Sequence, residues 1–169
     1  MILRIVFGFF FILSGAISQG KNPLQNFDKP AFYAVMASGK MGDIDKMLTL
    51  LNSVSIPEKE AYEGALMMRK SGLLKIAGEK LKLFKKGRIK LETELLKDSS
   101  NCEYHFLRLT IQEHAPKVVK YSAELESDKQ FIIKCFKNLA ADVQKIIFDY
   151  SKNSKILKQQ DLKFKNQDE

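Results

Sequence analysis

Apolar residues recur along most of this chain at the three- and four-residue spacing of an amphipathic helix. Ile44, Met47, Leu48 and Leu51 form one such stripe. Strict alternation of apolar and polar residues over the length of a strand is hard to find, and neither Asn-Gly nor Asp-Gly hairpin turns occur. The pattern therefore predicts an all-α protein.

Proline, glycine and capping residues divide this pattern into about seven helices. Pro30 suits the first turn of a helix that ends before Gly39, and Asn101 ends a turn that caps the next helix. The predicted helices span residues 30–38, 44–51, 55–70, 73–97, 102–114, 127–138 and 140–151, and 73–97 is either one helix or two joined near Gly87. Because short turns join antiparallel neighbours, we expect stacked antiparallel helical hairpins, either α-solenoid-like or an irregular bundle.

Residues 1–18 have the features of a cleaved secretory signal. Arg4 gives a positive start, residues 5–13 are apolar, and Ala16-Ile17-Ser18 fits the small-x-small cleavage rule. The apolar run is shorter than the ~20 residues of a spanning helix. Residues 13–16 resemble the bacterial lipoprotein cleavage box, but Ala16 stands where the lipidated Cys belongs. We therefore expect an exported protein, periplasmic or secreted, that is soluble after cleavage.

The rest of the chain has the size and composition of one globular domain. Of its 169 residues, 45% are apolar and 28% charged. We expect a lead-in over 19–29, a single helical domain over 30–151, and a polar tail over 152–169 that frays.

The mature chain keeps two cysteines, Cys102 and Cys135, on different predicted helices. In an oxidising compartment the two thiols can form one disulfide. Each can equally pack as a small buried hydrophobe. The sequence leaves both interpretations open, because it does not give the Cα separation that a disulfide requires.

Residues 84–109 resemble a tetratricopeptide-type joint between two helices. Gly87 lies inside helical sequence and is followed by Leu95-Leu96-Lys97-Asp98, then by Asn101 and Glu103, where an aromatic-rich helix begins. The stretch lacks the Trp of that repeat. The resemblance implies stacked helical hairpins, a scaffold that mostly binds peptides or proteins.

Residues 103–116 are similar to a segment of small exported helical proteins of bacteria that are functionally uncharacterised. This resemblance supports export. It implies no activity.

The segment 102–114 is predicted to be central to the core, because it is apolar on two sides. One side carries Tyr104, Leu107 and Ile111, and the other carries Phe106 and Leu109. Between them, His105, Arg108 and Gln112 form a polar stripe. The stripe is either a pocket in which Arg108 binds an anionic group or a structural network in which Arg108 pairs with a carboxylate of a neighbouring helix. We favour the network, because buried polar groups are usually hydrogen-bonded.

No catalytic or metal-binding constellation stands out in the sequence. The two histidines, His105 and His114, point apart on one helix, and a zinc site needs three or four converging ligands. Neither a recognisable nucleophile motif nor a glycine-rich phosphate loop occurs. We therefore expect a protein that is not an enzyme and binds no cofactor.

The net charge of +8 is concentrated in residues 69–97, which hold ten basic residues against three acidic ones. On a helical wheel, Lys75, Lys82, Lys85 and Lys86 lie opposite an apolar stripe formed by Leu73, Ile76, Ala77, Leu81 and Phe84. This lysine-rich face either meets anionic lipid, glycan or an acidic partner, or is merely solvated. Nucleic acid is not expected, because no exposed aromatic stacking pattern accompanies the lysines.

Three functional hypotheses follow. The first is a non-enzymatic exported scaffold that binds a protein or peptide partner in the cell envelope, which an exposed apolar groove would favour. The alternative is a peripheral envelope protein held to anionic lipid or glycan through the 69–97 face, which exposed aromatics beside the lysines would favour. The third is a small-molecule carrier, which a closed cavity reaching Arg108 would favour.

Overall fold

The computed structural model describes residues 27–163, and within this range the protein is all-α, without strands. The first 26 residues, which contain the expected signal and most of the lead-in, lie outside the described residues. The helices are α1 (Lys29–Ser38), α2 (Met41–Ser53), α3 (Lys59–Ser71), α4 (Ala77–Lys97), α5 (Cys102–His114), α6 (Leu125–Cys135), α7 (Ala141–Ser151) and α8 (Gln159–Lys163), with 3-10 segments at Lys117–Val119 and Phe136–Asn138. Seven of these helices have ten residues or more, so the expectation of about seven helices is confirmed.

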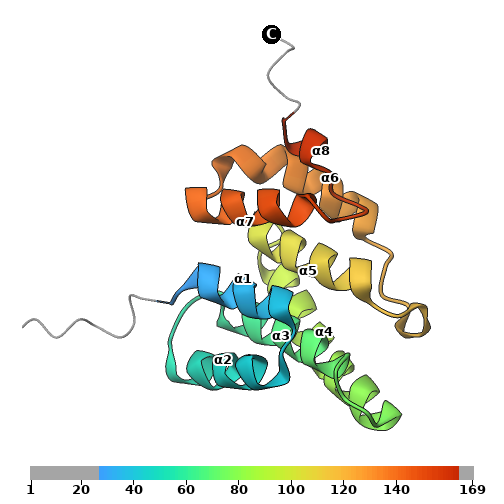
Figure 1. Ribbon diagram of the computed structural model, residues 1–169. Helices are drawn as coiled ribbons and strands as arrows, with labels where there is room; N and C mark the ends of the chain where they lie inside the picture. Colours follow the sequence, from blue (N-terminus) through green and yellow to red (C-terminus); the bar gives the residue numbers. More distant parts are fainter. Residues whose placement is uncertain (1–26, 164–169) are drawn as a thin grey trace, which may run out of the picture.

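The helices form two groups on either side of α5 (Figure 1). On one side α3 packs along α4 and also contacts α2, while on the other side α6 packs along α5. Contacts between α1 and α7 also join the two groups. Helix α5 is central as predicted, because Phe106, Leu107 and Leu109 are all fully or almost fully buried.

Capping groups set the predicted ends of α1 and α5. The Asn101 side-chain oxygen accepts hydrogen bonds from the backbone N–H groups of Glu103 (3.1 Å) and Tyr104 (3.2 Å). Pro30 lies in the first turn of α1, and Gly39 ends that helix at a φ of 60°, in the left-handed region that glycine tolerates.

Helix α4 is one helix, and Gly87 is a packing residue inside it rather than a break. A Cβ atom on Gly87 would lie 2.5 Å from the carbonyl oxygen of Gly64 on α3, and a Cβ on Gly64 would lie 2.6 Å from that of Gly87. The two helix backbones therefore approach each other too closely for any side chain at either position.

The start of α4 differs from the prediction. The helix begins at Ala77 instead of residue 73, so Leu73, Lys75 and Ile76 belong to the connection from α3. Ile76 is exposed and occupies an extended conformation before the first turn. Without burial, the apolar residues of 73–76 gain little from a helical conformation.

Helix α6 also begins earlier than predicted, at Leu125 instead of residue 127. Asp128, the second residue of the predicted helix, therefore lies at the end of the first turn of α6, and its side chain is fully buried. It is buried because it forms an ion pair with Arg108 of α5.

The tail does not fray from Lys152 as expected, at least as far as residue 163. Leu157 and Leu162 are buried against the core. Lys129 of α6 forms an ion pair with Asp161 of α8 (3.1 Å). Two widely spaced leucines anchor this polar and partly exposed segment to the core, so its composition alone was misleading.

The two cysteines are paired. Cys102, at the start of α5, and Cys135, at the end of α6, form a disulfide with a Cα–Cα distance of 6.0 Å across a separation of 33 residues. Among residues 27–163, we find no helix with the length and apolar character needed to cross a membrane.

Candidate functional site

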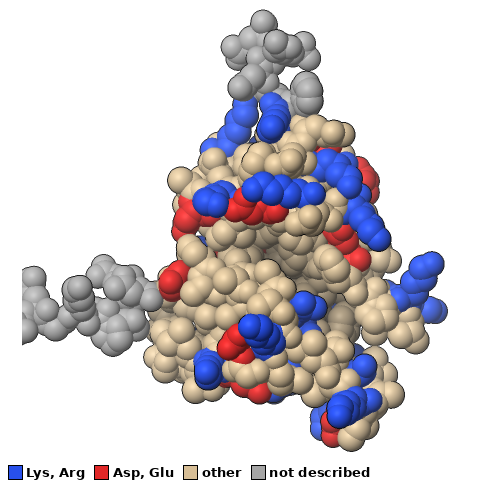
Figure 2. Space-filling model, in the orientation of Figure 1, with Lys and Arg blue, Asp and Glu red and all other residues tan. Residues whose placement is uncertain are grey.

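A large cleft lies between the two groups of helices. Its volume is about 1000 Å³, and residues of α1, α3, α4, α5 and α7 line it. Figure 2 shows the hollow between the upper and lower parts of the view, with a surface that carries few charged side chains.

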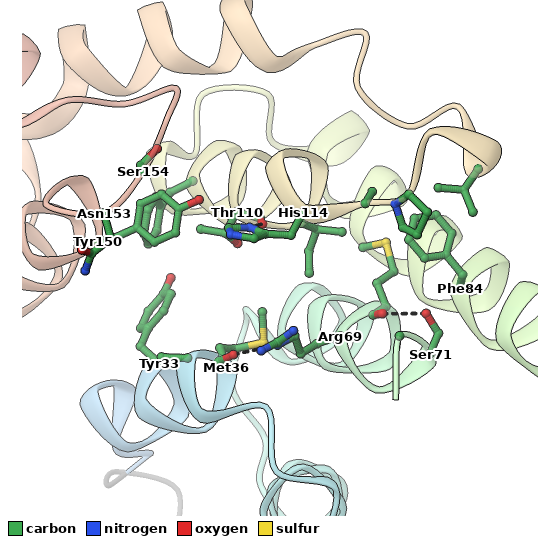
Figure 3. Close-up of a pocket in the computed structure, with 18 of the residues that line it drawn as sticks. Tyr33, Met36, Arg69, Ser71, Phe84, Thr110, His114, Tyr150, Asn153 and Ser154 are labelled. Atoms are coloured by element: carbon green, nitrogen blue, oxygen red, sulfur yellow. Dashed lines mark hydrogen bonds between the residues drawn. The ribbon is translucent and has the colours of Figure 1, made fainter. Parts of the chain in front are cut away.

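The walls of this cleft are mainly apolar. Helices α1 and α3 contribute Met36 and Met68, and helices α5 and α7 contribute Ile111 and Ile146 opposite them. Figure 3 shows Tyr33 extending from the α1 wall towards Tyr150 of α7. Apolar walls that face each other across an open space are typical of a site that receives an apolar ligand or partner.

The later part of the apolar stripe predicted on 73–84 lines one end of this cleft instead of packing fully into the core, whereas Leu73 and Ile76 do not line it. Only Phe84 of the stripe is buried. Ala77 and Leu81 line the cleft, and Leu81 is 45% exposed. Val118, in the 3-10 segment after α5, extends the same apolar rim and is 85% exposed. The sequence indicated that this segment carries apolar residues, but it did not indicate that some of them face a cleft.

Arg69, near the end of α3, is the cation on the wall of the cleft next to α1. Its Nε donates a hydrogen bond to the carbonyl oxygen of Met36 (3.0 Å), in the last turn of α1 (Figure 3). The guanidinium also lies against Gly39, where a Cβ atom would be 2.3 Å from one of its terminal nitrogens. The absence of a side chain at Gly39 therefore makes room for Arg69. Sequence reasoning missed this residue.

The acidic residue that lines the cleft, Asp149, is already paired. Lys145 (2.7 Å) and Lys152 (2.5 Å) donate hydrogen bonds to its carboxylate. These lysines hold the pKa of Asp149 at about 2. Asp149 stays ionised at neutral pH, with its charge balanced by its own lysines.

The tyrosine hydroxyls of the cleft are held by carboxylates, one buried and one half-buried. Tyr33 donates to Glu103 (2.9 Å), and Tyr150 donates to Glu113 (2.5 Å). Burial raises the pKa of both phenols, and the neighbouring carboxylates raise it further. Both hydroxyls therefore remain protonated and serve to position the walls.

Arg108 does not line this cleft. Its Nε and one terminal nitrogen donate to the two oxygens of Asp128 (2.8 and 2.7 Å), and its other terminal nitrogen donates to Glu92 of α4 (3.0 Å). Glu92 also accepts from the Tyr121 hydroxyl (2.5 Å). Burial alone would lower the pKa of Arg108, but the charges and hydrogen bonds of Asp128 and Glu92 raise it. These contacts match the structural-network interpretation, in which Arg108 joins helices.

His105 belongs to the same network, whereas Gln112 does not. One ring nitrogen of His105 lies 2.6 Å from an Asp128 oxygen, and the other lies 2.9 Å from the Ser99 carbonyl oxygen. Gln112 instead donates to Glu124 (2.8 Å). The residues of the predicted polar stripe therefore belong to two separate groups: His105 and Arg108 contact Asp128, and Gln112 contacts Glu124.

Of the predicted lysine-rich face, three members lie on α4. Lys82, Lys85 and Lys86 are exposed, and no partner for them occurs among the described residues. Lys75 precedes the helix, so its predicted position on the wheel is wrong. Ile89 and Leu96 lie on the same outward side of α4 and are 67% and 87% exposed. The large exposed hydrophobic residues of the described chain are all aliphatic, so no exposed aromatic residue among them lies beside these lysines.

Within the part of the chain that the structure describes, no three His, Cys, Asp or Glu side chains are arranged to hold a metal ion. Comparison of the chain with protein-family models, curated proteins and solved structures gives no match. The resemblance of residues 84–109 to a tetratricopeptide joint therefore stays a prediction.

Proposed function

We propose that this protein is a non-enzymatic exported scaffold that binds a helical segment of another protein in the cleft. The observation that carries the proposal is the open, apolar cleft between the α1/α3 wall and the α5/α7 wall. An amphipathic helix that lays its apolar face into such a groove is a common mode of peptide recognition.

The size of the cleft favours a protein segment over a small molecule. At about 1000 Å³, it is at the upper end of the range for small-ligand pockets. A helix about 10 Å across occupies roughly 80 Å³ per ångström of its length, so the cleft accommodates about two helical turns. Arg108, the centre of the carrier hypothesis, is absent from its lining.

The disulfide supports the exported location. Disulfides persist in oxidising compartments such as the periplasm and the extracellular space, and they are rare in the reducing cytosol. A Cys102–Cys135 bond is the arrangement that a protein with the signal expected at residues 1–18 would have after export.

A selection experiment tests the proposed binding. A phage library of amphipathic helical peptides is selected against the mature protein and against Ala34→Trp, which places a large side chain in the cleft from the exposed side of α1. Ala141→Trp is the matched control, because Ala141 is exposed on α7 and does not line the cleft. We expect peptides that bind the parent and Ala141→Trp but not Ala34→Trp. Peptides that bind all three proteins equally would contradict the proposal.

A second candidate function is attachment to an anionic envelope surface through α4. It rests on a separate observation: Lys82, Lys85 and Lys86 are exposed on one helix without carboxylate partners in the described chain, next to exposed Ile89 and Leu96. Clustered lysines and apolar side chains on one helix are typical of interfacial binding.

Vesicle binding tests this second function. The parent should bind phosphatidylglycerol vesicles at low salt and be released at 1 M salt, where the Debye length falls to about 3 Å. Changing Lys82, Lys85 and Lys86 to Gln should abolish binding. The control changes Lys40, Lys46 and Lys134 to Gln. These lysines are exposed and lie outside α4, so the control loses the same amount of positive charge from other parts of the surface. An equal loss of vesicle binding in both variants would show that binding depends only on the net charge of the protein, which would contradict a binding surface on α4.

A further inference from the structure

The cations of this fold differ in whether the protein itself neutralises them. Half-buried cations outside the cleft mostly form ion pairs with carboxylates: Lys29, Lys70, Lys90, Arg108 and Lys129. Lys59 instead donates to a backbone carbonyl oxygen. Arg69 and Lys80, which both line the cleft, are half-buried without a carboxylate partner in the described chain. Two uncompensated positive charges therefore face the apolar cleft.

The position of Arg69 is fixed by the protein, while most of its donors stay unused. The single hydrogen bond from Nε to Met36 anchors the guanidinium at the end of α1. Its packing against Gly39 holds it further. The two terminal nitrogens donate no hydrogen bond within the described residues. A guanidinium that is held by its Nε presents these remaining N–H groups as a fork that matches a carboxylate.

The cleft contains no acid that could neutralise these charges. Asp149 is the acidic residue of its lining, and Lys145 and Lys152 already bind its carboxylate. A cation in a partly desolvated site gains most from an anionic partner, because the electrostatic interaction there is less screened than in water.

We infer that the segment bound in the cleft carries a carboxylate beside its apolar face, and that Arg69 and Lys80 bind this carboxylate. The inference rests on the proposed function and specifies its partner: an acidic amphipathic helix. Arg69 fixes the position of the carboxylate along the cleft, since its guanidinium is anchored. Lys80 contributes charge from the α4 wall. The apolar walls supply contact area, and the two cations determine which apolar helices are accepted.

The test uses the peptide selection described above, repeated with Arg69→Gln, Arg69→Lys and Lys80→Gln. Peptides selected by the parent should share an apolar face and an Asp or Glu at one common position. Selection on Arg69→Gln should keep the apolar pattern and lose the acid. The Lys80→Gln variant is the second probe, because the Lys80 side chain lines the cleft and forms no hydrogen bond or ion pair with the described residues. Lys134→Gln, exposed on α6, is the control.

Matched peptides quantify the effect. For one selected peptide and its Glu→Gln version, the parent should bind the acidic form at least tenfold more tightly. That preference should fall to about twofold or less in Arg69→Gln and be kept in Lys134→Gln. Arg69→Lys should keep only part of it, because lysine retains the charge but has neither the Nε anchor nor the fork of the guanidinium. The melting temperature of each variant is measured to check that a loss of peptide preference does not come from unfolding.

The outcomes separate this inference from the proposed function. Peptides that need an open cleft but carry no common acid would overturn the inference and leave the proposed function intact. A selection that yields no cleft-dependent peptide would overturn the proposed function. If peptides fail while dodecanoate binds the parent and not Arg69→Gln, the carboxylate is that of a fatty acid, and the inference of a protein partner is wrong.

Discussion

Arg108 of α5 and Asp128 of α6 are joined by two parallel hydrogen bonds of 2.8 and 2.7 Å, and the Asp128 side chain is fully buried. This geometry is the bidentate pairing that arginine forms with carboxylates. Arg108 lies six residues after Cys102 on α5, and Asp128 lies seven residues before Cys135 on α6, so the ion pair joins the two helices about two turns away from the disulfide. Helices α5 and α6 are therefore joined both covalently and by a buried ion pair.

Arg108→Ala is expected to lower the free energy of unfolding by about 3 kcal/mol, because it leaves the buried Asp128 carboxylate without its partner. Chemical denaturation of the mature protein measures this. Lys145→Ala, which removes an exposed ion pair with Asp149, should leave stability nearly unchanged. An Arg108→Ala variant as stable as the parent would contradict a structural role for the network.

Removing the disulfide with Cys102→Ala and Cys135→Ala is expected to lower the free energy of unfolding by roughly 3–4 kcal/mol, the chain-entropy value for a cross-link over this separation. Denaturation with and without a thiol reductant measures it. The reductant should destabilise the parent and leave the double variant unaffected. A parent that is insensitive to reductant would show that the two cysteines are not paired.

Gly87→Ala is expected to destabilise the protein by about 2 kcal/mol, because the new Cβ would collide with the Gly64 backbone of α3. Gly78→Ala on the same helix is the matched control. A Cβ there meets nothing within 4 Å, so alanine should raise stability by up to about 1 kcal/mol. Thermal denaturation of both variants should show shifts of opposite sign.

Glu113 should make the protein sensitive to acid. Burial raises the pKa of its carboxyl, but hydrogen bonds from Ser154, Tyr150 and the Lys155 backbone outweigh this and lower the pKa. A carboxyl whose pKa is lowered in the folded state stabilises the fold to its full extent at pH values above the pKa of the unfolded state, near 4.3. This stabilisation is lost as the pH falls through the lower pKa of the folded state. Glu113→Gln should therefore be less stable than the parent at pH 6, and the difference should shrink towards pH 2. A pH-independent difference would contradict this.

The exported form is expected to begin at Gln19, because Ser18 completes the small-x-small cleavage pattern. The intact mass of protein isolated from the native cell envelope measures this. A full-length mass in the membrane fraction would show that the signal is kept as an anchor.

The starts of α2, α3 and α4 differ from the prediction by three or four residues, but the sequence by itself determined the helical class and most helix ends. These features depend on short-range interactions: the Asn101 side chain caps α5 from one residue before it, and the apolar period of a helix repeats within a few residues. The sequence also indicated that Arg108 needs a carboxylate, because a buried guanidinium without one is costly. It did not indicate which carboxylate, and Asp128 was expected at the start of a helix.

Only the tertiary structure decided which segments meet. The close approach of Gly64 and Gly87, the burial of Leu157 by the rest of the chain, and the cleft between α1 and α5 all join residues that are far apart in sequence. A helical period shows which side of a helix is apolar, but the same stripe can face a core or an open cleft. Leu81 and Phe84 belong to one predicted stripe, and only packing against the other helices left the first exposed and buried the second.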